Sequence, residues 1–175
     1  MAHKEQQYFL NRLRTLFPNS FRDVKVLDIG SLNINGSIRQ HFENSEILGV
    51  DVGEGPGVDL VCPGQELDHP DGYYDTVCSC ECFEHNPYWV ETFRNMIRMT
   101  RSGGLVVMTC ATDGRPEHGT RRSKPEDAPL ITWDYYRNLN EQDFREKFDL
   151  DHWFSEHAFM VEPTVHDLYF YGFRR

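Results

Sequence analysis

The sequence predicts a single α/β domain whose mostly parallel sheet is covered by helices on both faces. Three observations predict this fold class. A chain of 175 residues suits one domain. Short apolar runs that read as strands alternate with segments of helical periodicity. Glycine and acidic residues follow the strands directly, and ligands in such sheets bind outside the carboxyl ends of the strands.

Each predicted strand is a short apolar run next to a turn or a helix. The runs are residues 24–29, 47–50, 58–61, 74–79, 105–108, 150–154 and 167–173. We therefore expect seven strands in one sheet.

The helices are predicted from apolar spacing and from their end signals. The first has apolar residues at Phe9, Leu13, Leu16 and Phe17 and ends at Pro18. A short second helix carries Ile38 and Phe42 one turn apart. The third has Asn86 as its N-cap, Pro87 at its first position and Gly103-Gly104 as its stop. The last starts near Asn140, where Leu139 and Phe144 occupy the two positions of a hydrophobic staple.

Residues 112–134 lack periodicity and are rich in glycine, proline and charge. They predict a long loop after the fifth strand, on the ligand-binding edge of the sheet. Connections of this length within a compact domain are often functional. We expect the loop to close one side of the substrate cavity, with His118 facing the reacting group.

The composition excludes several classes of protein. A formal net charge of -10 disfavours nucleic acid as a partner. No apolar run approaches the roughly 18 residues of a membrane span, and the first ten residues lack the apolar core of a secretory signal. The five cysteines follow no disulfide pattern, so we expect them to be reduced. These features predict a cytoplasmic protein.

Two turns are candidate ligand sites. Gly30 directly follows a buried strand, where a glycine lets the backbone turn sharply and approach a ligand. The free N–H groups of the next helix would then face that ligand. Asp51 ends the next strand, and its carboxylate could accept both hydroxyls of a ribose. Each feature alone also fits an ordinary turn or a surface aspartate.

Five segments in order resemble the class I S-adenosylmethionine-dependent methyltransferases. They are VLDIG at 26–30, LGVD at 48–51, GVDLV at 57–61, YYDTVCSCECFEH at 73–85 and MTRSGGLVVMTC at 99–110. The resemblance implies a Rossmann-like three-layer sandwich. Its seven-stranded sheet is mostly parallel with an antiparallel last strand, and its cofactor is S-adenosylmethionine.

The resemblance also implies roles for individual residues. Asp28 would order the glycine loop and reach the amino end of the methionine, while Gly30, Ser31 and Gly36 shape that loop. Asp51 would hold the ribose, with Val52 beside the adenine. Backbone near Gly64 and Gln65 would meet the adenine edge, and Cys80 or Glu81 would border the methionine moiety.

Two positions depart from the family pattern. The usual third glycine of the loop is missing between Gly30 and Gly36, and Asn33 or Asn35 could replace it because asparagine tolerates left-handed backbone. Pro63 stands where the family often has an aspartate for the adenine amino group.

Two histidines are candidate catalytic residues. His85 follows the fourth strand and could deprotonate an acceptor as the methyl group leaves, since its pKa lies near neutral. His118 lies within the long loop, near a basic cluster of Arg121, Arg122 and Lys124 that could clamp an anionic acceptor. A loop histidine in contact with water and a solvated basic loop are the alternatives.

We expect no metal site in this chain. Cys78, Cys80 and Cys82 alternate along a strand near His85, but zinc sites prefer two or more residues between paired cysteines. The cysteines are better explained as small apolar side chains on one face of the strand.

The sequence therefore predicts methyl transfer from S-adenosylmethionine to a small-molecule acceptor with an oxygen or nitrogen nucleophile, anionic acceptors included. Two alternatives remain open at this point. A nicotinamide-dependent oxidoreductase would need a G-x-G-x-x-G loop, which Gly30-Ser31-Leu32 breaks. A binding module that holds the nucleoside cofactor without turnover would share the same motifs.

Overall fold

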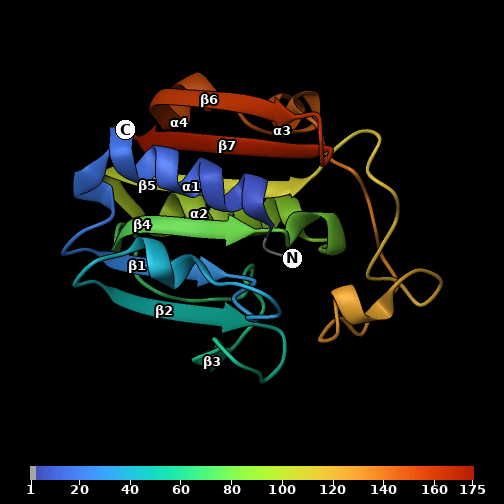
Figure 1. Cartoon of the computed structure of the whole chain (residues 1–175). Coiled ribbons are helices and arrows are strands. Elements are labelled where there is room, and N and C mark those ends of the chain that lie inside the picture. The colour runs from blue at the N-terminus through green and yellow to red at the C-terminus, as the bar shows by residue number, and fades with distance from the viewer. Residues whose placement is uncertain (1–2) are drawn as a thin grey trace.

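The computed structural model describes residues 3–175 and contains one seven-stranded sheet (Figure 1). The strands are β1 (Lys25–Ile29), β2 (Glu46–Asp51), β3 (Leu60–Val61), β4 (Tyr74–Cys80), β5 (Thr100–Ala111), β6 (Phe154–Glu162) and β7 (Asp167–Arg174). Their order across the sheet is β3-β2-β1-β4-β5-β7-β6. The first five run parallel, and β7 lies antiparallel to both β5 and β6. The predicted mostly parallel sheet with an antiparallel last strand is confirmed.

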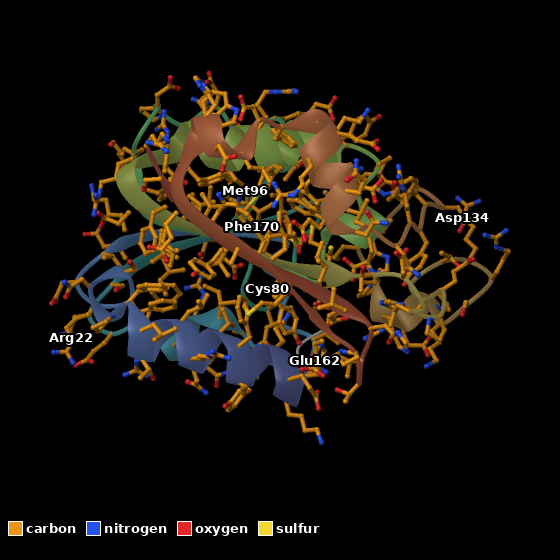
Figure 2. All side chains as sticks on the ribbon, turned by 90° about the horizontal axis from the view of Figure 1, so that it is seen from above. Arg22, Cys80, Met96, Asp134, Glu162 and Phe170 are labelled. Atoms are coloured by element: carbon orange, nitrogen blue, oxygen red, sulfur yellow. The ribbon has the colours of Figure 1, made fainter. Side chains whose placement is uncertain are left out.

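Helices cover both faces of the sheet, which gives three layers (Figure 2). One face carries α1 (Lys4–Leu16) and the short 3-10 helix η2 (Ile38–His41). The other carries α2 (Trp89–Met99), α3 (Glu141–Lys147) and α4 (Leu150–Trp153). The remaining 3-10 turns are η1 (Pro18–Ser20), η3 (Phe83–His85) and η4 (Pro125–Asp127). Within residues 3–175, no helix is long and apolar enough to cross a membrane.

Two apolar clusters, one on each face, hold the layers together. On the α1 side, Phe9, Leu10 and Leu13 pack against Val26 and Val107 of the sheet. On the other side, the fully buried Phe93 lies at the centre of an aromatic group that includes Phe144, Phe148, Phe154 and Phe170. Burying one such aromatic side chain contributes about 3 kcal/mol. Leu16 was predicted to belong to the buried face of α1, but it is 56% exposed at the end of the helix.

Three predicted elements differ in the structure. The second helix is only the four-residue η2. The run 150–154 was predicted as a strand, but Leu150–Trp153 is a helical turn, because Asp149 Oδ1 accepts a hydrogen bond from His152 N (3.1 Å) and caps it. The third helix ends at Met99 rather than at Gly103-Gly104, and those glycines lie inside the longer strand β5.

The last predicted helix is present with its predicted cap. Asn140 Oδ1 accepts from Asp143 N (3.2 Å), and Asp143 Oδ2 accepts from Asn140 N (2.9 Å), which forms a capping box. Leu139 and Phe144, the predicted staple pair, are both fully buried in the same core cluster. The end of the long loop is thereby fixed to the sheet.

Candidate active site

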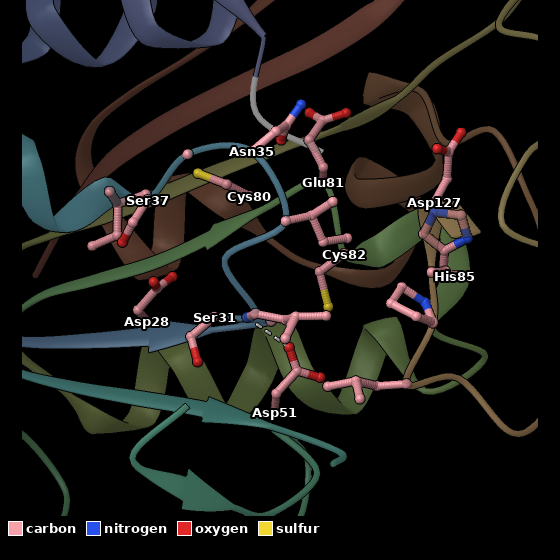
Figure 3. Close-up of a pocket in the computed structure, with 18 of the residues that line it drawn as sticks. Asp28, Ser31, Asn35, Ser37, Asp51, Cys80, Glu81, Cys82, His85 and Asp127 are labelled. Carbon is pink, nitrogen blue, oxygen red and sulfur yellow. Dashed lines mark hydrogen bonds between the residues drawn. The ribbon is translucent and has the colours of Figure 1, made fainter. Parts of the chain in front are cut away.

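A cavity of about 750 Å³, partly open to solvent, lies at the carboxyl ends of β1, β2 and β4 (Figure 3). Four segments form its walls: the loop after β1, the end of β2, the turn after β4 and the distal part of the long loop. This is the edge of the sheet where the sequence placed a ligand site. Among the predicted cofactor residues, those that line it are Asp28, Gly30, Ser31, Gly36, Asp51, Cys80 and Glu81.

Gly30 is required at the start of the loop for two reasons. Its φ is +80°, a conformation that side chains disfavour. A Cβ at this position would also lie 2.7 Å from the Cβ of Cys82. The chain can therefore turn off β1 and run close to the turn after β4 only with a glycine here.

The rest of this loop is held by Asn33 and Asp51. Asn33 Oδ1 accepts from Gly36 N (2.9 Å), and Asp51 Oδ2 accepts from Leu32 N (3.0 Å). The expectation that Asn33 or Asn35 adopts a left-handed backbone is wrong, since neither has a positive φ. Asn33 does not line the cavity but ties the loop through its side chain, whereas Asn35 does line it.

Asp51 projects from the end of β2 between two cavities. Burial raises the pKa of its carboxyl, while hydrogen bonds from Leu32 N and Val52 N oppose that shift. Each carboxylate oxygen accepts one of these backbone bonds. A carboxylate has about four acceptor positions, so Asp51 retains capacity for a ligand's hydroxyl groups.

Asp28 is a buried acid in the cavity wall. It is only 4% exposed, and no hydrogen bond joins its side chain to any residue from 3 to 175. Burial raises the pKa of Asp28 to about 7, with Arg39 opposing the shift and Asp51 and Asp59 adding to it. A buried carboxyl without a protein partner at a cavity wall is a functional candidate.

A second cavity of about 360 Å³ adjoins the first and shares Gly30, Asp51, Cys82 and Ile131 with it. Its walls include the remaining predicted cofactor residues, Val52, Gly64 and Gln65. Trp133 closes it and donates from Nε1 to the carbonyl of His85 (2.7 Å). The two cavities together outline an elongated ligand site.

The turn after β4 carries Glu81, whose φ of +53° is unusual for a residue with a side chain. Glu81 is buried and its Oε1 accepts from Thr109 Oγ1 (2.8 Å), which in turn accepts from Gln6 Nε2 (3.0 Å). Burial raises the pKa of Glu81. This chain of bonds fixes the turn to β5 and to α1, and it brings Gln6 to the cavity wall.

The two predicted histidines lie together but not in equivalent positions. His85 lines the cavity, and burial lowers its pKa to about 3, with His118 adding to the shift. The ring of His118 packs edge-to-face against that of His85, with centroids 5.0 Å apart. His118 does not line the cavity, so the predicted contact with the reacting group is not observed. Tyr136 packs against both rings.

The distal part of the long loop reaches the cavity, whereas its basic cluster does not. Residues 127–131 line the first cavity, and Ile131 and Trp133 line the second. Arg122 instead pairs with Glu117 (3.0 Å) on the exposed surface, and Arg121 is also exposed. The cluster is therefore not placed to clamp a ligand in either cavity.

Several wall residues were not named individually from the sequence. Leu32, Ile34, Ser37 and Ile38 belong to the loop after β1 and to η2, Cys82 to the turn after β4, and residues 127–131 to the long loop that was expected to close the cavity, whereas Gln6 comes from α1. Cys82 could have been found from its place in the turn after β4. Gln6 carries no such signal, because it reaches the cavity through the packing of α1 against β5.

Comparison with known proteins gives one family match. The family model described as "Methyltransferase domain" matches residues 1–163. The chain belongs to this methyltransferase family. A search of curated proteins gives no match.

Two solved structures show the same Rossmann-like fold as this methyltransferase domain. One is Burkholderia thailandensis 1,6-didemethyltoxoflavin-N1-methyltransferase with bound 1,6-didemethyltoxoflavin and S-adenosylhomocysteine. It has a TM-score of 0.61 and 16% identity, covering 99% of this chain and 91% of that one. The other is Haemonchus contortus phosphoethanolamine N-methyltransferase 2 in complex with S-adenosyl-L-methionine. It has a TM-score of 0.65 and 15% identity, covering 95% and 52%. At these identities the likeness concerns the fold.

Proposed function

We propose that this methyltransferase transfers the methyl group of S-adenosylmethionine to an oxygen or nitrogen atom of a small-molecule acceptor. The observation that carries the proposal is the charge of the cavity wall. Asp28, Asp51, Glu81 and Asp127 line the first cavity, and among residues 3–175 no lysine or arginine lines either cavity. S-adenosylmethionine carries a sulfonium and an ammonium, so an acidic wall attracts it.

The same wall disfavours the oxidoreductase alternative. A nicotinamide dinucleotide carries a pyrophosphate, which is bound by a glycine-rich loop at a helix N-terminus. The loop after β1 leads here to the 3-10 helix η2, and the carboxylates around it would repel phosphate. The family match favours methyl transfer independently.

The proposed cofactor follows the two cavities. Its amino group would pair with Asp28, which lacks any other partner in the described residues. The ribose hydroxyls would bind Asp51, and the adenine would occupy the second cavity beside Val52, with backbone at Gly64 and Gln65 along its edge. Cys80 and Glu81 would border the methionine chain, and Gly30, Ser31 and Gly36 would follow its length.

The acceptor would enter beside His85 and residues 127–131, which line the first cavity. In Figure 3, His85 and Asp127 lie on the opposite side of the cavity from Asp28. Methyl transfer from a sulfonium needs mainly alignment of the nucleophile with the methyl group, so positioning supplies most of the catalysis. His85 is the proposed general base for an acceptor that carries a proton, and its imidazole is neutral because burial lowers its pKa to about 3. At that pKa it is a much weaker base than the near-neutral histidine expected from the sequence. Arg121, Arg122 and Lys124 do not line either cavity, so they are not placed to clamp an anionic acceptor.

Calorimetry with S-adenosylmethionine, S-adenosylhomocysteine and NAD tests the cofactor assignment. We expect both sulfur compounds to bind and NAD not to bind. Binding of NAD alone would overturn the proposal. An assay for released S-adenosylhomocysteine with a panel of small hydroxyl and amine acceptors then separates an enzyme from a binding module, since only turnover releases the product in excess over the protein.

A further inference from the structure

Glu84, His85 and His118 form a compact group of potential metal ligands at the acceptor side of the cavity. Glu84 is fully buried, and the two histidines are 5% and 6% exposed. One donor atom from each lies within 4.8 Å of the other two. Ligands about 2.1 Å from one ion can lie at most about 4.2 Å apart, so small side-chain rotations would close these three around an ion.

Three potential donor atoms of this group, on Glu84 and His85, lack hydrogen-bond partners among the described residues. Among residues 3–175, neither carboxylate oxygen of Glu84 has a hydrogen bond, and Nδ1 of His85 has none. Leaving a buried polar atom unpaired costs about 1–3 kcal/mol, and more for a charged group. Three such atoms on two adjacent residues indicate that something other than the described side chains satisfies them.

A second group of three potential metal ligands differs from the first in its hydrogen bonding. His3, Glu81 and Asp167 also lie close together, but each of the three has a hydrogen-bond partner within the protein, and within this group only Oε2 of Glu81 is a buried atom without one among residues 3–175. His3 Nε2 bonds with Asp167 Oδ2 (2.5 Å), Arg115 donates to Asp167 Oδ1 (3.0 Å), and Glu81 accepts from Thr109. Those contacts explain the second group as a structural network, whereas no such contacts explain the first.

The surroundings hold His118 in the orientation that a metal ligand needs. Its Nδ1 lies 3.0 Å from the carbonyl oxygen of Pro116, which can only accept, so Nδ1 carries the proton and Nε2 the lone pair. Ligating histidines are commonly oriented by a carbonyl or carboxylate in this way. Gly119 lets the loop pack closely here, because a Cβ there would lie 2.6 Å from Cε1 of His85.

We propose that Glu84, His85 and His118 bind one divalent transition-metal ion, with Zn²⁺ the best match for two imidazoles and a carboxylate. Three protein ligands leave a coordination position open for an oxygen of a bound molecule. Because His85 also lines the cavity, that position would serve the acceptor. The acceptor role rests on the proposed function, whereas the metal site does not.

Titration of EDTA-treated full-length protein with Zn²⁺ alone tests the site by calorimetry. We expect one equivalent to bind, and binding to weaken at least about 10-fold in Glu84→Gln and in His118→Ala. The exposed His152→Ala serves as the control and should bind as the wild type does. Mg²⁺ should bind far more weakly, since it prefers oxygen ligands.

A second measurement uses only the wild-type protein, so it tests the metal site even if the variants fail to fold. Co²⁺ added to the EDTA-treated protein should give visible d–d absorption typical of nitrogen and oxygen ligation, and one equivalent of Zn²⁺ should abolish it. The absence of stoichiometric Zn²⁺ binding, or binding unchanged in Glu84→Gln and His118→Ala, would overturn the site. S-adenosylhomocysteine binding is measured separately in EDTA, so failure of the metal site and failure of the cofactor assignment give different results.

Discussion

The buried carboxyl of Asp28 should lower the stability of the folded protein at neutral pH, and this cost can be measured. Burial raises its pKa from 3.8 to about 7, so the folded protein disfavours the ionised form that the unfolded chain adopts above pH 4. Each unit of difference corresponds to about 1.4 kcal/mol, which gives a penalty on the order of 4 kcal/mol. The penalty is absent below pH 3.8, grows as the pH rises to about 7, and is constant above that.

Asp28→Asn keeps the shape of the side chain and removes this titration. In cofactor-free protein we expect the variant to be more stable than the wild type by up to about 4 kcal/mol near pH 7.5, and by only about 1 kcal/mol near pH 4.5. Urea denaturation followed by circular dichroism at several pH values measures the difference. A difference that does not change with pH, or a variant less stable throughout, would refute the reasoning.

Asp75→Asn is a control in which the change in stability should have the opposite sign, because the pKa of Asp75 is lowered rather than raised. Although its partial burial opposes the shift, hydrogen bonds from Arg101 and from Lys25 N lower the pKa of Asp75. Its contribution to stability is present above pH 3.8 and is lost as the pH falls through the lowered value. The variant should therefore be less stable than the wild type at neutral pH, and the loss should shrink in acid.

Cofactor binding should favour the ionised form of Asp28, which the cofactor-free protein disfavours. If the carboxylate pairs with the ammonium of the ligand, binding requires the ionised form, so wild-type affinity for S-adenosylhomocysteine should fall as the pH drops below 7. Asp28→Asn should bind more weakly and show little dependence on pH over that range. Calorimetry at matched pH values measures both trends, and equal affinity of the two proteins at pH 8 would remove Asp28 from the ligand site.

Three further predictions test the neighbouring parts of the structure. Asp51→Ala should weaken cofactor binding, measured by calorimetry, by about 1–3 kcal/mol. Asp51→Asn can still accept the hydrogen bond from Leu32 N, so it separates loss of the ligand contact from loss of loop support. Unchanged affinity in both variants would exclude a role for Asp51 in ribose binding. Asn140→Ala should lower the free energy of unfolding by about 1 kcal/mol in urea, since it removes the cap of α3, and no loss would show that the capping box is unimportant. Gly119→Ala should lower the melting temperature more than Gly103→Ala. Both glycines have a positive φ, but only a Cβ at position 119 would lie against His85. Equal losses in the two variants would contradict the close packing at Gly119.

The sheet could be predicted because its signals are local. Buried strands such as β1 are short apolar runs, and the cap and staple of α3 lie within six residues of one another. The errors arose where tertiary contacts or caps overrule such signals. The run 150–154 is apolar enough for a strand, but the Asp149 cap stabilises a helical turn instead.

The site was predictable where it depends on the ends of strands, and less so elsewhere. Asp51 follows from the order of the strands, since parallel strands end at the same edge, whereas Asp28 and Glu81 were expected from the family resemblance. The position of His118 depends instead on how a loop of more than twenty residues folds back onto η3. That path is set by contacts such as Trp133 with His85, which no local pattern reveals.

The shortness of η2 connects the fold to the choice of ligand. A helix after the glycine loop would direct several free N–H groups and the positive end of its dipole at the cavity, which favours phosphate. Here Ser37 accepts from Arg39 N and caps a turn of only four residues, so this source of positive potential is largely missing. Asp28 and Asp51 lie at this end of the loop, and burial raises the pKa of both carboxyls, with Arg39 opposing the shift at Asp28. A ligand whose net charge is positive supplies what the shortened helix does not, and this separates S-adenosylmethionine from a dinucleotide, whose pyrophosphate makes it anionic overall.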